Sequence, residues 1–505
     1  MNIIFRVDAS AEIGGGHFFR CLGIADVLKS QGNTCIFMSQ SLSKDMEELL
    51  NQKEHGLLQL DAKTEKEEIK LCRLLLYRWM QQHGEIHTII IDHYQRSHQW
   101  ESAFYPICKR FVVIDDLANR PHMADILLDS SLGRKPIDYE KLLPEHCQVL
   151  AGAEFTPLRY EFSKCPPTEK IIQHRQHPKN KVLIAMSATD PENMTETVLS
   201  ILEDWKHGPK FQFSVVLTSG AKYLANVANK VKKSPLNITL HRDVSNMREL
   251  YFKHDLAIGA AGTSAMERCV CGLPSVAIGI VDNQMFNIQQ FMKANALLAA
   301  LDRHELEEKL VPSIEKSASN KQYYQEVVKN GLALCDGKGI LRTANAFQAE
   351  LPAYRIWFRA VNAMDVKVMY EWQCHPDTRK YSRNPEPPSF EEHQLWVERN
   401  LLSSQNQLWM LCHQEAGTKE EKLGVIRISP NSEREHNEVS IYLNPAMYGQ
   451  GIATRALTLL LGIYQEQKLE AYIQPDNKAS VKSFLKAGFR PTKQDWYIAT
   501  YESKI

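Results

Sequence analysis

The sequence predicts an α/β fold in which two doubly wound domains with parallel sheets are followed by a smaller α+β domain. The chain has 505 residues, which at about 150 residues per domain corresponds to roughly three domains. Short apolar runs alternate with helical patterns over the first two thirds of the chain, as they do in parallel sheets. The order of elements changes near residue 350. We therefore expect domains at 1–165, 166–350 and 351–505.

The first domain opens with the apolar run Ile3–Phe5, then a glycine turn at Gly14–Gly16 and a helical pattern from His17 to Gln31. In this pattern apolar residues recur every three or four positions, and Gly32 supplies a stop signal. Further buried strands are predicted at 35–38, 88–91, 111–114 and 126–128. Because helical patterns separate these strands, we expect a parallel sheet.

A polar, basic stretch from Ser163 to Lys181 is predicted to be an interdomain linker. After it the alternation restarts, with strands predicted at 182–186, 213–217, 256–259 and 275–278 and helices at 194–205 and 221–231. The last domain differs, because helices predicted at 363–372 and 390–402 precede strands at 408–412, 424–428 and 439–443. This order is typical of an α+β domain.

Composition narrows the class of protein. Sixty Lys and Arg residues balance sixty Asp and Glu residues, which argues against nucleic acid or an anionic membrane surface as the main partner. The eleven cysteines form no CxxC pair and no zinc-like cluster, and His174-x-x-His177 lies in the predicted linker, so no metal is expected. Without a signal peptide or an apolar run of about 18 residues, we expect a soluble protein of the reducing cytoplasm.

The glycine turn before the first helix has two readings. Gly15 and Gly16 allow a ligand to approach the backbone, and the helix start offers free N–H groups to an anion. Alternatively, the glycines only tighten a strand-to-helix turn. Two doubly wound domains in succession also leave a groove between the carboxyl ends of their sheets, where a nucleotide-sugar would fit.

Five segments in order carry a family resemblance. They are FRVDASAEIGGGHFFRCLGIADVL, Ile91–Tyr94, Val113–Ala118, Gly152–Phe162 and Asp255–Gln284. Together they resemble the UDP-2,4-diacetamido-2,4,6-trideoxy-β-L-altropyranose hydrolases, the PseG proteins, and are similar to spore-coat polysaccharide proteins. The resemblance covers residues 1 to about 345. It implies a GT-B-like pair of Rossmann-type domains that binds a UDP-amino-sugar and hydrolyses it with inversion at the anomeric carbon.

The resemblance also implies the residues of this first site. It makes His17 the catalytic base, since histidine titrates near neutrality and can take a proton from water. UDP is a good leaving group, so a second carboxyl group is not required. We expect Asp8 to orient the water or the imidazole, or else to cap the turn. The substrate-binding residues lie in the glycine turn and in two stretches of the second domain: Gly15, Gly16, Gly262, Thr263, Ser264, Glu267, Asp282, Asn283 and Gln284.

Within the second domain, the helix that opens at Gly262 is expected to hold the diphosphate, and Glu267 to accept hydrogen bonds from the ribose. Asp282–Gln284 is expected to face the sugar or the diphosphate. One departure from the family is visible after the domain's first strand, where Ser187–Pro191 lacks the usual pair of glycines. Side chains there restrict the approach of the backbone to phosphate, so sugar preference or affinity is expected to differ.

The third domain contains EVSIYLNPAMYGQGIATRALTLLL, in which a strand runs through a glycine turn into a helix. This stretch, with a later segment from Asn477 to Phe489, resembles the signature of GNAT N-acetyltransferases, whose small residues expose N–H groups to the CoA pyrophosphate. The resemblance implies acetyl-CoA as cosubstrate. Its contacts would come from the turn, the helix start and one later side chain: Gly449, Gln450, Gly451, Ile452, Ala453, Thr454 and Asn477.

Two positions bear on the acetyl transfer itself. Glu438 matches an acid that often serves as the base for the amine, although an exposed strand glutamate is the alternative. Phe484 stands where many members carry the tyrosine that protonates the thiolate, so another tyrosine, unassisted departure or loss of activity is expected. The run 365–401 resembles the PseH subset, which acts on UDP-4-amino sugars, with five side chains in register: Trp372, Arg379, Ser382, His393 and Trp396. The aromatic side chains among them would stack on uracil or sugar, or else both tryptophans belong to the core.

Because the two activities are adjacent steps, the sequence predicts a bifunctional enzyme of pseudaminic acid biosynthesis. The last domain would acetylate the 4-amino group of a UDP-sugar, and the first two would hydrolyse the product. One alternative is a GT-B glycosyltransferase with a CoA-dependent acyltransferase domain. The other is a non-catalytic UDP-sugar-binding scaffold. A homo-oligomer is compatible with the sequence.

Overall fold

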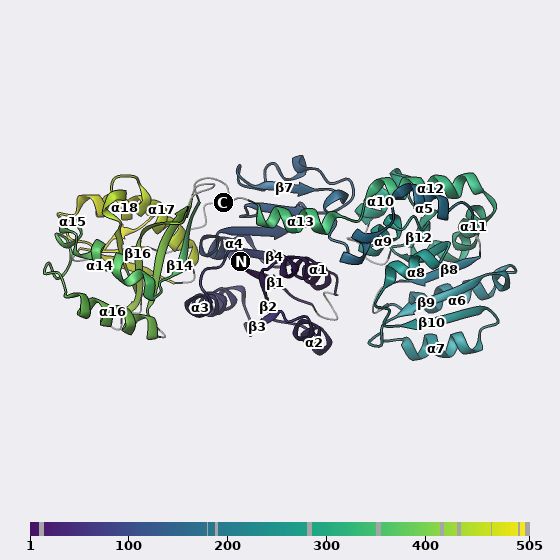
Figure 1. Ribbon diagram of the computed structural model, residues 1–505, viewed down its shortest axis with the longest axis horizontal. Helices are drawn as coiled ribbons and strands as arrows, with labels where there is room; N and C mark the ends of the chain where they lie inside the picture. Colours follow the sequence, from purple (N-terminus) through teal and green to yellow (C-terminus); the bar gives the residue numbers. More distant parts are fainter. Residues whose placement is uncertain are drawn as a thin grey trace.

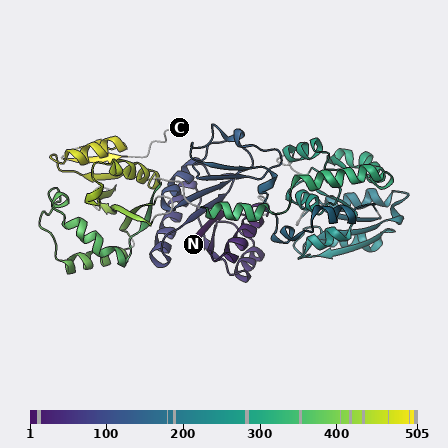
Figure 2. The ribbon, with the colours of Figure 1, turned by 45° about the horizontal axis from the view of Figure 1, so that its top comes forward.

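The computed structural model describes residues 1–9, 15–178, 180–186, 190–279, 285–349, 355–403, 405–414, 419–431, 436–465, 467–492 and 495–499. The chain forms three units, each built on one sheet (Figure 1). They lie in a row with the first unit at the centre, the second on one side and the third on the other, as a second view confirms (Figure 2). The predicted fold class, a pair of Rossmann-type domains and then an α+β domain, is confirmed.

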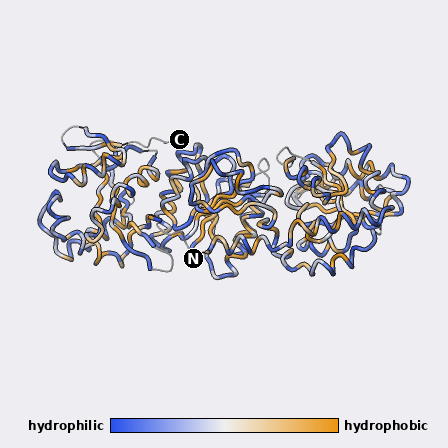
Figure 3. The backbone as a smooth tube through the Cα atoms, turned by 90° about the horizontal axis from the view of Figure 1, so that it is seen from above, coloured by the Kyte–Doolittle hydropathy of each residue, from blue (hydrophilic) through white to orange (hydrophobic). Residues whose placement is uncertain are grey.

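The first unit is a sheet of seven parallel strands in the order β3-β2-β1-β4-β5-β6-β7. Its strands are Asn2–Val7 (β1), Thr34–Ser39 (β2), Gly56–Gln59 (β3), Thr88–Asp92 (β4), Arg110–Ile114 (β5), Ile126–Asp129 (β6) and Gln148–Ala151 (β7). Helices Gly16–Ser30 (α1), Lys44–Gln52 (α2), Glu65–His83 (α3) and His98–Phe104 (α4) complete it. Apolar residues concentrate along its central strands (Figure 3), since helices cover both faces of a parallel sheet.

The second unit repeats this plan with six parallel strands in the order β10-β9-β8-β11-β12-β13. They are Lys181–Ala185 (β8), Gln212–Leu217 (β9), Asn237–Arg242 (β10), Leu256–Ala260 (β11), Ser275–Ile278 (β12) and Ala299–Leu301 (β13). Its helices are Thr168–His174 (α5), Met194–Glu203 (α6), Leu224–Lys233 (α7), Met247–Lys253 (α8), Thr263–Val270 (α9), Met285–Lys293 (α10), Leu306–Ser319 (α11) and Lys321–Leu334 (α12).

The chain crosses between these two units twice. Helix α13 (Gly339–Gln348) falls in the second predicted domain, yet Ile340 and Phe347 pack into the core of the first unit beside α1.

The segment predicted to be a linker is not one throughout, because it contains α5. The Arg175 side chain after α5 is buried and donates hydrogen bonds to the backbone oxygens of Tyr251 and Cys271. Arg175 of the predicted linker is therefore part of the interior of the second unit.

The third unit has a mixed sheet in the order β14-β15-β16-β17-β18-β20-β19. Its strands are Arg355–Ala360 (β14), Gln407–Gln414 (β15), Glu421–Asn431 (β16), His436–Leu443 (β17), Leu469–Tyr472 (β18), Arg490–Pro491 (β19) and Trp496–Ala499 (β20). Helices Val366–Cys374 (α14), Pro376–Arg379 (α15), Phe390–Leu402 (α16), Ile452–Ile463 (α17) and Lys478–Ala487 (α18) pack around it. Only β17 and β18 pair in parallel among its described strands.

The third unit is joined to the first by one continuous hydrophobic core. The Tyr77 ring of α3 meets the Trp409 ring of β15 edge-on, with centroids 4.8 Å apart. Tyr77 Oη also accepts a hydrogen bond from the Leu408 backbone N–H at 2.7 Å and donates to the Leu408 oxygen. A buried ion pair between Arg355 and Asp125 crosses the same interface. The two units therefore form a single packed body.

The described residues lack a membrane-spanning helix and a cluster of metal ligands. None of its helices combines the length and the apolar character that a membrane crossing requires. In the same ranges, no three His, Cys, Asp or Glu side chains gather in an arrangement that could hold a metal ion.

Candidate active sites

His17 lies in the first turn of α1, next to the carboxyl end of β4. Strands β1 and β4 are neighbours in register, with Val7 opposite Asp92, so the segments that follow them leave the same edge of the sheet. The Nδ1 atom of His17 is 2.6 Å from Asp92 Oδ1. Because the Asp92 side chain is fully buried, it fixes the ring in one orientation and directs Nδ1 inward. We assign the Nδ1 proton to this bond, which leaves Nε2 able to accept a proton.

Arg20, one turn further along α1, supports the same carboxylate. Its Nε lies 2.5 Å from Asp92 Oδ2 and its Nη2 lies 2.6 Å from Asp92 Oδ1. Burial alone would raise the pKa of Asp92, but Arg20 and His17 outweigh burial and hold it well below its usual range. Asp92 therefore stays ionised and can stabilise a positive charge on the imidazole.

A second carboxylate completes this cluster. Asp116 accepts hydrogen bonds from Arg20 Nη1 at 3.2 Å and from Tyr94 Oη at 2.8 Å. The Tyr94 ring meets the His17 ring edge-on, with centroids 4.6 Å apart. Arg20 is thus held by two carboxylates, and His17 is held between Asp92 and an aromatic ring.

Asp8, predicted to orient the water or the imidazole, makes its bonds elsewhere. Its carboxylate accepts from Ser39 Oγ and the Gln40 backbone N–H, and it pairs with Arg6 and with His93 Nε2 at 3.0 Å. No bond joins Asp8 to His17 in the described part of the chain. Asp92, and not Asp8, contacts the imidazole of His17. Gly15 is the N-cap of α1, and Gly16 is exposed in its first turn.

The predicted diphosphate site is at the start of α9. Gly262 is its N-cap and no side chain caps the helix, which leaves the first N–H groups, including those of Thr263 and Ser264, for a ligand. Glu267 is buried one turn further along, where Arg159 binds both its oxygens at 3.0 Å and Tyr251 Oη donates to one of them. A ribose would share this carboxylate with Arg159, since two oxygens offer about four acceptor positions.

Some predicted features of the second unit lie outside the described residues. Asp282, Asn283 and Gln284 belong to this group, as do the positions 187–189 that depart from the family pattern. Asp190 is described, and its carboxylate accepts hydrogen bonds from the backbone N–H groups of Met194 and Thr195 at the start of α6. That helix terminus is therefore occupied by the chain's own carboxylate.

The His17 cluster is linked to the second unit through Arg134. Its Nη2 donates to the Asp116 backbone oxygen at 3.0 Å. Its guanidinium lies 4.6 Å from the centre of the Phe286 ring of α10. The carboxyl edge of the first sheet therefore faces α10, and the third unit lies on the opposite side of the first unit (Figure 1).

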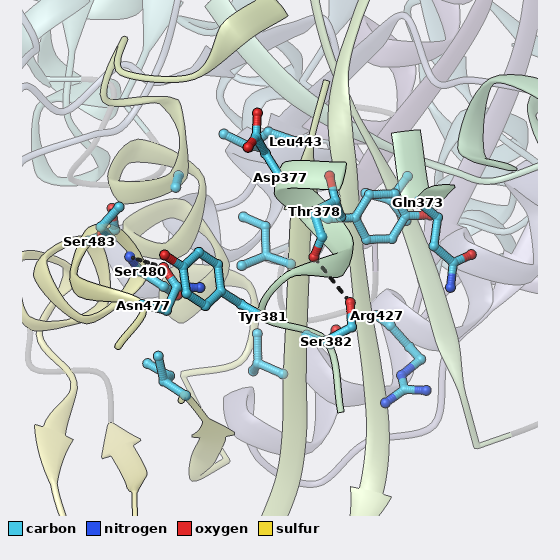
Figure 4. A pocket seen from close by; sticks show the side chains of 18 of the residues that line it. Gln373, Asp377, Thr378, Tyr381, Ser382, Arg427, Leu443, Asn477, Ser480 and Ser483 are labelled. Atoms are coloured by element: carbon cyan, nitrogen blue, oxygen red, sulfur yellow. Dashed lines mark hydrogen bonds between the residues drawn. The ribbon is translucent and has the colours of Figure 1, made fainter. Parts of the chain in front are cut away.

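The third unit contains a cavity of about 1160 Å³. It opens where β17 and β18 separate, because their parallel pairing ends after Asn437 opposite Leu469 and Glu438 opposite Glu470. Figure 4 shows Asn477, Ser480 and Ser483 of α18 on one side of this pocket, and Gln373 and Arg427 on the other.

The predicted acetyl-CoA turn borders this cavity. Gly449 and Gly451 have φ angles of 79° and 76°, a backbone conformation that favours glycine. Gly451 is the N-cap of α17, and no side chain caps this helix. The N–H groups of its first turn, which borders the cavity, are therefore available to a ligand. Six of the seven predicted cofactor residues line the cavity and Gln450 does not: Gly449, Gly451, Ile452, Ala453, Thr454 and Asn477. Asn477 also caps α18 through the Ser480 N–H.

Glu438 lines the same cavity, with its Oε1 3.0 Å from Arg383 Nη2 and its side chain 16% exposed. Phe484 also lines it, packed edge-on against Phe489 with 3% exposed surface. The two tryptophans predicted to stack on a ligand differ in position. Trp372 belongs to a hydrophobic core of the third unit, whereas Trp396 packs against that core and also lines the cavity.

These features define two classes of domain, and comparison with known families agrees. Residues 188–336 match the glycosyltransferase family 28 C-terminal domain, and residues 355–490 match the acetyltransferase (GNAT) domain. The second unit is therefore similar to a glycosyltransferase family 28 C-terminal domain, and the third unit to a GNAT acetyltransferase domain.

Individual relatives extend this assignment. An uncharacterised protein of Methanocaldococcus jannaschii is 24% identical over 98% of both chains. The UDP-2,4-diacetamido-2,4,6-trideoxy-β-L-altropyranose hydrolase of Campylobacter jejuni is 27% identical over 56% of this chain and 93% of its own length. The crystal structure of Acinetobacter baumannii MurG superposes with a TM-score of 0.51 at 14% identity, covering 69% of this chain and 99% of MurG. The last match shows a shared GT-B fold.

Sequence reasoning missed the partners of the predicted residues. Asp92 and Asp116 both lie in segments that carried the family resemblance, and each follows a buried strand. Adjacent parallel strands bring residues at their carboxyl ends together at one edge of the sheet, so these positions could have been predicted to lie near His17. Arg159 also lies in a segment that carried the resemblance, but no pattern in the sequence indicated that it contacts Glu267, more than 100 residues later.

Proposed function

We propose that the chain is a bifunctional nucleotide-sugar enzyme. Its third unit would transfer an acetyl group from acetyl-CoA to the 4-amino group of a UDP-4-amino sugar. Its first two units would hydrolyse the resulting UDP-2,4-diacetamido-2,4,6-trideoxy-β-L-altropyranose to UDP and the free sugar, a precursor of pseudaminic acid. The observation that carries the hydrolytic half is the His17–Asp92 pair at the carboxyl edge of the first sheet, in a chain similar to the C. jejuni hydrolase.

In the hydrolytic step, His17 Nε2 takes a proton from water as the oxygen attacks the anomeric carbon. The bond between that carbon and the UDP oxygen breaks, and both its electrons leave with UDP. Attack opposite to departure inverts the anomeric configuration. Ionised Asp92 stabilises the imidazolium that forms and maintains the ring orientation, as an acid does behind a catalytic histidine.

UDP would be held by the second unit. The N–H groups at the start of α9 offer hydrogen bonds and a positive dipole end to the diphosphate. Glu267 would accept the ribose hydroxyls, with Arg159 fixing its orientation.

For acetyl transfer, the N–H groups of the Gly449–Ala453 turn would bind the CoA pyrophosphate. Glu438 would accept a proton from the acceptor ammonium, whose free amine then attacks the thioester carbonyl. The carbon–sulfur bond breaks, CoA leaves as the thiolate, and the nitrogen of the new amide releases its remaining extra proton to solvent. Phe484 has no proton to give, so in this proposal the thiolate departs without an acid from α18 and is protonated by solvent.

The hydrolysis is tested by incubating the purified chain with the UDP-diacetamido sugar in ¹⁸O-labelled water. We expect UDP and free sugar without any added acceptor, one ¹⁸O atom at the anomeric carbon, and an inverted anomer by NMR at early times. Unlabelled sugar together with labelled UDP would place the attack at phosphorus, and a retained anomer would exclude a single displacement by water at the anomeric carbon.

A glycosyltransferase is the second candidate, because the fold is shared with MurG and residues 188–336 match a glycosyltransferase domain. It predicts negligible UDP release until an acceptor hydroxyl compound is added. The acceptor-free incubation therefore separates the two candidates directly.

A further inference from the structure

Several buried polar atoms without partners gather at the third-unit cavity. Across the residues that the structure describes, five such atoms belong to residues that line it: Gln373 Oε1, Arg379 Nε, His393 Nε2, Arg427 Nε and Tyr442 Oη. A buried polar group left without a hydrogen bond costs about 1–3 kcal/mol, so native proteins rarely tolerate one. A cluster of them around a cavity is explained if a ligand supplies the missing partners.

These groups come from two helices and two strands that border the cavity, and Gln373 and Arg427 lie across it from Asn477, Ser480 and Ser483 (Figure 4). Gln373 lies on α14 and His393 on α16, while Arg427 and Tyr442 lie on β16 and β17. In the antiparallel register Arg427 is opposite Ser440, and Ser440 lies between Glu438 and Tyr442 on one face of β17. Arg427 and Tyr442 therefore share a face of the sheet with the proposed base Glu438, and Gln373 and His393 reach the same cavity from helices.

The chemistry of this set restricts the ligand. It contains an amide oxygen that accepts, a phenol that donates or accepts, an imidazole nitrogen and guanidinium N–H groups that only donate. A ligand that satisfies all of them needs both hydrogen-bond donors and hydrogen-bond acceptors, as hydroxyl and amide groups provide. The cavity is also lined by Arg379, Arg383 and Arg427, of which Arg383 pairs with Glu438, and these guanidinium groups disfavour a polycation and favour an acceptor that carries negative charge.

We propose that Gln373, His393, Arg427 and Tyr442 form the subsite that binds the hydroxyl and N-acyl groups of an anionic amino-sugar acceptor, and that polyamines are excluded from it. This inference rests on the acetyl transfer proposed above and names the substrate class of that site. Tyr442 is a binding residue in this scheme. Its phenol is held in the neutral form, since burial raises its pKa, so it can donate to a sugar oxygen at any pH of interest.

The test compares Tyr442→Phe and Gln373→Met with Tyr497→Phe. The first two remove one unpartnered group each with little change of shape. The control changes a tyrosine on β20 that does not line the cavity. For each variant, CoA release is followed with UDP-4-amino-4,6-dideoxy-N-acetyl-β-L-altrosamine and with spermine as acceptors. Acetyl-CoA affinity is measured by calorimetry.

We expect Tyr442→Phe and Gln373→Met each to raise KM for the amino sugar about tenfold, the equivalent of one hydrogen bond of about 1.4 kcal/mol. The dissociation constant of acetyl-CoA should stay within about twofold, as should both constants in Tyr497→Phe. Unchanged KM in both cavity variants, or acetylation of spermine as efficient as that of the amino sugar, would overturn the subsite while leaving acetyl transfer in place. A wild-type chain that binds acetyl-CoA but releases no CoA with the amino sugar would overturn the proposed function and the subsite together.

Discussion

Asp92 is the residue through which the first site is organised. Its buried carboxylate accepts hydrogen bonds from His17 and Arg20, which lie one turn apart on α1. Neither contact could be predicted from local patterns, because 72 residues separate Asp92 from Arg20. His17 itself could be predicted, since the glycine turn and the family resemblance marked it. Asp8, which was predicted to orient the water or the imidazole, belongs to a neighbouring ion-pair network instead.

Replacing Asp92 by asparagine tests this organisation. The Asp92→Asn variant loses the negative charge that stabilises the imidazolium and can hold the other ring tautomer. We expect kcat for UDP release to fall about 10²–10⁴-fold, the range of general-base contributions. Initial rates of UDP formation measure it.

The acetyl-transfer half of the same chain is the control for Asp92→Asn, since that site lies in a different unit. CoA release should remain within about twofold of the wild type, which would show a folded chain. UDP release at the wild-type rate would mean that the carboxylate does not act on His17.

At the scale of elements, the best predicted strands were the buried central ones. The runs near β1, β4, β5, β8, β11 and β12 were predicted within a residue or two, because continuous apolar sequence reflects helices on both faces. The strands that were missed, β3, β7, β10 and β13, lie at the edges of the two parallel sheets. Their burial is partial and their sequences mixed, as in NITLHR of β10, so period and hydrophobicity gave no clear signal.

The turn before α17 makes a prediction at this scale. A Cβ on Gly451 would meet no atom within 4 Å, but its φ is 76°. The Gly451→Ala change therefore strains only the backbone, by about 1–2 kcal/mol. We expect acetyl-CoA affinity to fall about fivefold or more as the turn relaxes away from the pyrophosphate.

Calorimetric titration with acetyl-CoA gives the affinity of Gly451→Ala. Gly220→Ala is the matched control, because a Cβ there also meets no atom and φ lies outside the left-handed region. Equal affinity in both variants would show that the Gly451 conformation is not part of the cofactor site.

At the scale of the molecule, the third unit is fused to the first rather than tethered to it. The sequence predicted a separate domain from residue 351 but not the surface on which it packs. Tyr77 and Arg73 lie on a helix, and nothing in the local sequence pattern distinguishes them as contacts to another domain. In the structure Tyr77 accepts from and donates to the Leu408 backbone, and Arg73 donates to the Ile463 oxygen. These bonds across several hundred residues of sequence make the two units one cooperative body.

Tyr77→Phe tests this docking. The variant leaves the buried Leu408 N–H without its partner, at a cost of about 1–3 kcal/mol, whereas the Leu408 oxygen keeps the hydrogen bond from the Val361 N–H. We expect the midpoint of thermal unfolding to fall by several degrees, and UDP release and CoA release to be lost together on heating. Tyr160→Phe, at an exposed tyrosine, should have no effect. Loss of CoA release alone would show that the units unfold independently.

The same interface predicts a dependence of stability on pH. Glu85 of the first unit contacts Glu420 of the third and Lys109, and burial together with the bond to Glu420 raises the pKa of Glu85 from 4.5 to about 7 despite Lys109. The folded chain then binds this proton more tightly than the unfolded chain. Its contribution to stability is present below pH 4.5 and is lost as pH rises through 7.

Glu85→Gln removes this titration and keeps a group that can donate to Glu420. We expect the variant to unfold at a higher temperature than the wild type at pH 8, and the difference to shrink at pH 5.5. A difference that is constant across this range would contradict the raised pKa. Unfolding followed by calorimetry at several pH values provides the comparison.

One reaction course tests the account most directly. The His17→Asn variant keeps an amide that can bond to Asp92 but has no nitrogen at the position of Nε2. It is incubated with acetyl-CoA and the UDP-4-amino sugar while CoA, UDP and the nucleotide sugar are followed together. We predict CoA release at the wild-type rate, accumulation of the acetylated UDP-sugar, and UDP release slowed at least about 100-fold. UDP release at the wild-type rate would contradict the assignment of His17 as the base.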